Sequence, residues 1–261
     1  MNGELAQLVA LATHGTSWLA RGGEPPDLLL ENSTFKFVRV IEFADGSGTV
    51  SGVAPWLMGL ASRRVRRLWL VIPDPPPVRP RWPYLDAHLE VAFSNAGGWH
   101  VLATADEGHP AEAWTSQWHV EDLRVPDRKV WTVRIEGRPA PRSQPRQFDL
   151  EHARVALVNT IEAARALATR EFPEWAPAFA GALSATSPIY NPDLMASDFP
   201  GPAQRLAAMA DTAWVFGGMG SWNDVAFPSP AIEAEHREVS RALYGAVTQA
   251  LVAAVNCPLP E

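Results

Sequence analysis

Cysteine and lysine are both scarce in this chain. Its single cysteine, Cys257, cannot form an internal disulfide, which excludes a small secreted scaffold held by disulfides and favours the reducing cytoplasm. Only two of the 22 basic residues are lysine, Lys36 and Lys129. Together with the many alanines and prolines, this usage indicates a GC-rich, bacterial genome.

Long hydrophobic runs are also missing. The two longest stretches without charge, residues 175–192 and 242–260, contain prolines or polar side chains, so neither qualifies as a membrane span. The first residues carry Glu4 where a signal peptide has basic residues, so we expect no secretion signal. The sequence thus predicts a soluble, cytoplasmic protein that does not enter a membrane.

What the chain does contain is an ordinary globular composition with an uneven charge distribution. Hydrophobic residues make up 47% and charged residues 20% of its 261 residues, enough for one large or two modest domains. The net charge is −7: residues 1–147 carry 16 basic and 16 acidic side chains, and residues 148–261 carry 6 and 13. An acidic surface repels phosphate backbones and suits a basic partner, so nucleic-acid binding is not expected.

The first half shows mostly the alternating pattern of β-strands. After an amphipathic helix at residues 5–20 and around a short helix at 53–61, we predict five or six strands. They fall at residues 34–43, 67–72, 88–93, 99–103, 116–120 and 129–135. Because no helix is expected between the last four, the predicted fold is α+β, with an antiparallel meander following an N-terminal helix.

The second half has the period of helices. Residues 150–171 present a broad apolar face after a capping Asp149, and further helices are predicted at 173–183, 202–214 and 231–254. Three prolines in residues 137–147 indicate a linker there. We therefore expect a β-rich region at 1–147 and an acidic group of about four helices at 148–261, either separate or packed as one domain.

The most distinctive segment combines glycines, tryptophans and polar side chains. Glycines let a backbone approach a ligand closely, and an indole offers it a flat apolar wall. The predicted ligand-binding residues are Trp214, Gly217, Gly218, Gly220, Ser221, Trp222, Asn223 and Asp224. The structural alternative is a tight turn in which Asn223 or Asp224 bonds to local backbone and Trp222 fills the core.

Complete catalytic or metal-binding motifs are not found. The glycine-rich segment has no lysine for a phosphate loop, and Ser221 does not lie in a Gly-x-Ser-x-Gly elbow. Glu233 and His236 form the only Glu-x-x-His pair, whereas a di-iron bundle needs two. We predict no catalytic residue, metal or cofactor.

Two functions remain open at this point. The first is a non-catalytic accessory or interaction protein, such as an acidic inhibitor or immunity-type partner of a basic protein, or a homo-oligomer. The second is a small-molecule binder or enzyme with its site at residues 217–224. The sequence does not decide whether the chain is an enzyme.

Overall fold

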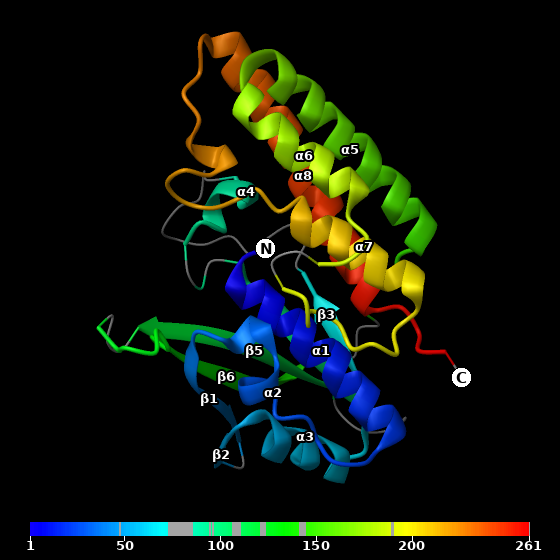
Figure 1. Ribbon diagram of the computed structural model, residues 1–261. Coiled ribbons are helices and arrows are strands. Elements are labelled where there is room, and N and C mark those ends of the chain that lie inside the picture. The colour runs from blue at the N-terminus through cyan, green and yellow to red at the C-terminus, as the bar shows by residue number, and fades with distance from the viewer. Residues whose placement is uncertain are drawn as a thin grey trace.

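The structure is a computed structural model that describes residues 1–46, 48–72, 86–93, 95, 97–105, 111–120, 124–140, 145–188 and 191–260. It combines a six-stranded sheet with a group of long helices, and helix α1 (Gly3–Arg21) lies between them (Figure 1). The sequence has a proline-dense stretch at residues 73–83, which is expected to form an extended loop, and this stretch lies outside the described residues. The mixed α and β composition expected from the sequence is confirmed.

The sheet has the strand order β2-β1-β6-β5-β4-β3. Its strands are β1 (Val38–Asp45), β2 (Gly48–Ser51), β3 (Val65–Val71), β4 (His100–Ala105), β5 (Ala111–Val120) and β6 (Trp131–Ala140). Strands β3 to β6 form an antiparallel meander. Strands β1 and β2 form a hairpin, and β1 pairs with β6, the last strand of the meander.

One strand pair departs from the prediction. Strands β1 and β6 run parallel, with Ile41 opposite Val133, so the sheet is mixed and the purely antiparallel expectation was wrong. The reason lies in the crossover between the hairpin and the meander. Helix α3 (Val53–Ser62) connects β2 to β3, which lie at opposite edges of the sheet, and so fixes the direction in which the meander returns to β1.

The predicted strand at residues 88–93 was also wrong. This segment contains the one-turn helix α4 (Ala87–Glu90), which places His88 and Glu90 in the interior. An alternation of only a few residues does not distinguish a strand from a short helix. The short helix predicted at residues 53–61 is confirmed as α3. Together with α2 (Leu28–Glu31) and the 3₁₀ turn η1 (Ser33–Phe35), which were not predicted, it spreads the helices through the first half.

The second half is helical as predicted, and its first helix begins and ends at the expected residues. Helix α5 (Leu150–Glu171) starts at Asp149, whose carboxylate accepts a hydrogen bond of 2.8 Å from the backbone N–H of His152. The remaining elements are η2 (Pro173–Trp175), α6 (Ala176–Ser184), α7 (Gly201–Thr212), η3 (Trp222–Asp224) and α8 (Pro230–Val255). Helices α5 to α8 pack together as one layer (Figure 1).

Helix α1 joins the two layers. Every residue from Glu4 to Thr13 is buried, so this half of the helix is covered on all sides and not only on the one apolar face that its period predicted. Gly15 permits the close contact with β3, since a Cβ there would lie 2.5 Å from the side chain of Leu68. One hydrophobic cluster therefore continues from the sheet through α1 into α8.

The sheet edge at β3 is closed by side chains. The hydroxyl of Thr16 on α1 accepts from the N–H of Leu68 and donates to its C=O, at 3.1 and 3.0 Å. Asn256, just after α8, bonds to the backbone of Leu70 in the same way. The opposite edge strand, β2, is exposed along its length.

Strand β6 extends further than expected. It continues to Ala140, so the first four residues of the predicted linker, 137–140, belong to the sheet instead. Trp114 packs over Gly137 in this extension. A residue with a Cβ would not fit at this position, because the Cβ would lie 2.7 Å from the indole. Residues 145–149 lead without regular structure into α5.

Candidate functional site: the 217–224 loop

The candidate site follows α7 and includes η3. Its backbone closes on itself, because the N–H of Trp222 donates to the C=O of Val215 at 3.2 Å and the N–H of Ser221 donates to that of Gly218 at 3.2 Å. We call residues 217–224 the 217–224 loop. These bonds bring all of the predicted residues except Trp214 into one compact turn.

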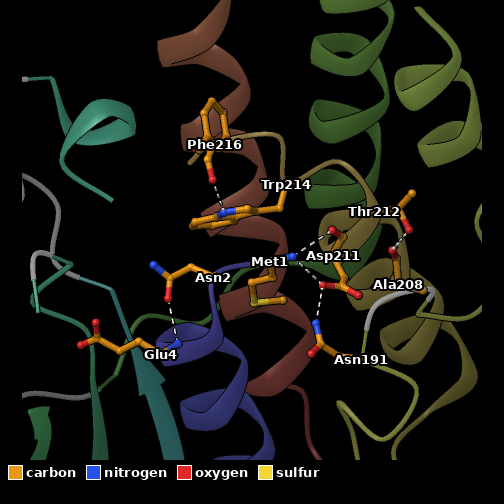
Figure 2. Close-up of polar contacts among 9 residues, drawn as sticks. All are labelled: Met1, Asn2, Glu4, Asn191, Ala208, Asp211, Thr212, Trp214 and Phe216. Carbon is orange, nitrogen blue, oxygen red and sulfur yellow. Dashed lines mark hydrogen bonds and ion pairs between the residues drawn. The ribbon is translucent and has the colours of Figure 1, made fainter. Parts of the chain in front are cut away.

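Trp214 faces a different part of the interior. Its indole N–H donates to the C=O of Phe216 at 3.0 Å, and its ring meets those of Trp99 and Tyr244 edge to face at 6.0 and 5.9 Å. In Figure 2 it lies next to Met1 and Asn2, at the N-terminal end of α1. Burial raises the pKa of the Tyr244 hydroxyl to about 12.

Trp222 anchors the loop in the core. The indole is fully buried and donates to the hydroxyl of Ser240 on α8 at 2.8 Å. Its backbone C=O lies 3.0 Å from Nε2 of His236, and its ring packs edge to face on Phe179 and Phe172. Trp222 therefore fills a space between α6 and α8 and presents no exposed wall to a ligand.

The polar side chains of the loop bond to backbone. Ser221 Oγ accepts from the N–H of Asn223 at 3.2 Å, and Asp224 Oδ2 accepts from the N–H of Gly220 at 2.8 Å. The amide of Asn223 donates to the C=O of His88 on α4 at 2.7 Å. These contacts tie the loop to itself and to the first half of the chain.

Two buried polar atoms next to these bonds are left over. Nδ1 of His88 and Oδ1 of Asn223 have no hydrogen-bond partner among the described residues. Buried polar atoms are usually paired, by protein or by another polar molecule. Within the described part of the chain, these two atoms leave polar contacts next to the loop for another molecule to make.

Two histidines beneath the loop are held neutral by their surroundings. Burial lowers the pKa of His88 to about 4, although the nearby charge of Asp86 acts in the opposite direction. Burial also lowers the pKa of His236, although its bond to Trp222 acts in the opposite direction. Both rings are therefore neutral near neutral pH. His236 contacts the C=O of Trp222 and the hydroxyl of Ser240, whereas Nδ1 of His88 has no partner among the described residues.

The tip of the loop is its exposed part. Met219 is 98% exposed and lies between Gly218 and Gly220. Gly220 has a φ of +74°, which disfavours any residue with a Cβ, whereas a Cβ on Gly218 would meet nothing within 4 Å. The glycines were predicted from the sequence as ligand-binding residues, but Met219 was not. The residue type of Met219 does not indicate that its side chain is exposed.

A second polar cluster, which the sequence did not reveal, joins the two halves. The terminal ammonium of Met1 lies 3.0 Å from Oδ1 of Asp211 on α7; Asp211 is fully buried, and Met1 is partly buried (Figure 2). Asn191 donates to the same oxygen at 2.9 Å. A fully buried carboxylate requires such compensation, so this contact fixes the start of α1 against α7.

Outside the loop, an open hollow lies on the helical layer. It has a volume of about 600 Å³ and lies between α5 and the η2–α6 segment, lined mainly by alanine and proline with Glu162 and Arg165 at its rim. No group of three or more metal-ligating side chains occurs within the described ranges. In the same part of the chain, no helix has the length and hydropathy needed to cross a bilayer.

Comparison with known proteins gives no relative from which to transfer a role. No family model, curated protein or solved structure matches this chain. The candidate site therefore depends on its geometry alone, and ligand binding by the 217–224 loop stays a prediction.

Proposed function

We propose that this chain is a non-catalytic interaction protein, an acidic inhibitor-type partner of a basic protein. The observation that carries the proposal is the excess of free carboxylates on the helical layer. Glu162 on α5, Glu174 on η2 and Glu238 on α8 are exposed and have no partner among the described residues. Such carboxylates attract a positively charged surface.

The arginines of the same layer do not cancel these charges. Arg154 pairs with Glu151, Arg237 pairs with Glu233, and Arg170 contacts both Glu171 and Glu235. Each of these arginines pairs with at least one acid. Among the described residues, Arg165 and Arg205 are exposed without such a pair, but residues 148–261 stay negative, with 6 basic against 13 acidic side chains. Opposite charge chiefly raises the rate of encounter and excludes wrong partners.

The geometry of the 217–224 loop supports the same proposal. A catalytic site needs polar groups aimed at a substrate, but Ser221 and Asp224 accept hydrogen bonds from the loop's own backbone. These side chains therefore stabilise the conformation of the loop. A loop of fixed conformation suits contact with another protein.

Charge reversal tests the proposal. Wild-type protein immobilised at low salt is expected to retain a basic protein from a lysate of the encoding organism and to release it as salt is raised. The triple substitution Glu162→Lys, Glu174→Lys and Glu238→Lys is expected to weaken the affinity of the purified partner by at least about tenfold. Calorimetry measures that affinity.

The matched control places the same charge change elsewhere. Glu24, Asp27 and Glu31 are exposed between α1 and η1, and their replacement by lysine changes the net charge equally. We expect this variant to bind within about threefold of wild type. An equal loss of affinity in both variants would mean that binding depends only on net charge. Failure of wild type to retain any basic protein would contradict the proposed function.

The alternative function, a small-molecule binder at the 217–224 loop, is favoured by the two unpaired atoms on His88 and Asn223. A ligand there would stabilise the folded chain by mass action. A metabolite screen by thermal shift tests it: a rise in Tm that Asn223→Ala abolishes would support a ligand site. Unchanged Tm across the screen would remove this alternative.

A further inference from the structure

Met219 is the most exposed large apolar side chain among the described residues. Its exposed fraction is 98%, compared with 75% for Leu30 and 58% for Met58. Scattered apolar residues are normal on protein surfaces, so exposure alone carries no conclusion. Met219 is distinguished by the hydrogen bonds that order the backbone of the 217–224 loop on both sides of it.

The loop holds this methionine at a fixed position. On its C-terminal side, the N–H of Gly220 donates to Asp224, and Trp222 is fixed to Ser240 in the core. On its N-terminal side, the C=O of Gly218 accepts from Ser221. Because the backbone is already ordered, a partner that covers the side chain loses little conformational entropy on binding.

The charge shown next to this support is negative. Asp224 is exposed, and its carboxylate accepts from the N–H of Gly220, the residue directly after Met219. The helical layer from which the loop extends carries the chain's excess of acidic side chains. An apolar tip beside an exposed carboxylate matches a partner with an apolar socket inside a basic rim.

We infer that Met219 is the apolar anchor by which this chain binds its basic protein partner. The inference rests on the proposed function and adds the place of contact. Methionine suits this role because its flexible, polarisable side chain adapts to an irregular pocket, and interface cores are enriched in it. A few such residues supply most of the binding free energy of an interface.

The flanking glycine fits the same picture. Gly218 has an ordinary φ and open space around it, so neither conformation nor packing requires glycine there. Without a side chain at this position, a partner can approach the backbone beside Met219 closely. A bulky residue at 218 is therefore expected to obstruct binding while leaving the fold unchanged.

The experiment uses the full chain and a photoreactive diazirine amino acid placed at position 219 or, as a matched control, at position 58. Irradiation in a lysate of the encoding organism is expected to cross-link a basic protein from position 219 only. That protein is then purified, and its affinity for wild type and for Met219→Ala, Met58→Ala and Gly218→Val is measured by calorimetry.

We expect Met219→Ala and Gly218→Val to weaken binding by at least about tenfold, and Met58→Ala by less than about twofold, with Tm unchanged in all three. A partner that binds Met219→Ala as tightly as wild type overturns the inference and leaves the proposed function standing. Cross-linking of position 219 to a second copy of this chain also overturns it, and the absence of any basic partner overturns both.

Discussion

The side-chain amide of Asn256 forms two hydrogen bonds with the backbone of Leu70, accepting from its N–H at 2.9 Å and donating to its C=O at 3.0 Å. It occupies the place that a neighbouring strand would take at the edge of the sheet. Unpaired edge groups attract other strands, so this contact also protects the edge.

Asn256→Ala is expected to lower the free energy of unfolding by about 2 to 4 kcal/mol, because two backbone groups of Leu70 lose their partner in a buried setting. Urea titration followed by circular dichroism measures the loss. Thr160→Val is the control, since that hydroxyl bonds only to carbonyls of its own helix. A loss no larger than that of the control would show that water replaces the amide.

The ion pair between Met1 and Asp211 is expected to be a strong contact. Asp211→Ala leaves a partly buried ammonium and the amide of Asn191 without their acceptor, which is expected to cost about 2 to 3 kcal/mol of stability. Asp224→Ala, which removes an exposed carboxylate bonded to one N–H, is expected to cost about 1 kcal/mol or less. Urea unfolding compares the two, and similar losses would contradict the structure at Asp211.

The backbone of the 217–224 loop gives a prediction with an internal control. Gly220→Ala forces a Cβ into a backbone with φ of +74° and is expected to cost about 1 to 2 kcal/mol. Gly218→Ala meets no neighbouring atom and is expected to change stability by less than about 0.5 kcal/mol. Thermal unfolding of both variants measures the difference, and a reversed order would mean that the loop adopts another conformation.

Stability is expected to fall as pH falls from about 6.5 toward 4. The folded state lowers the pKa of His88 to about 4, so the unfolded chain binds the proton first and protonation favours unfolding. The full effect of this shift is about 3 kcal/mol. His88→Gln is expected to flatten the pH dependence of urea unfolding over this range.

The control for that measurement is His152→Gln, at an exposed position on α5. It is expected to leave the slope of stability against pH as in wild type. An unchanged slope in His88→Gln would show that other groups, including carboxylates elsewhere, account for the acid sensitivity.

The helices were predictable because their signals are local. The apolar period and the capping Asp149 defined α5 to its terminal residues, since cap and period both act within one turn. The parallel pairing of β1 with β6 was not predictable, because Ile41 and Val133 are far apart in sequence and no local pattern records which strands meet. The one-turn α4 was too short for its period to be recognised.

The candidate site was predictable only in outline. Its glycines and tryptophans marked an unusual turn, but the direction of each side chain depends on α8 and α4, which lie elsewhere in the sequence. Ser240 determines where the indole of Trp222 points, and the C=O of His88 holds Asn223. The exposure of Met219 follows from these contacts and not from its own residue type.

Closure of the β3 edge depends on residues from distant parts of the chain. Thr16 precedes the strand, whereas Asn256 follows it by 186 positions. A ribosome therefore releases the whole sheet long before the second of these contacts can form. During that interval the Leu70 part of the edge stays open, and an open strand edge exposes the nascent chain to aggregation until the helical layer is complete.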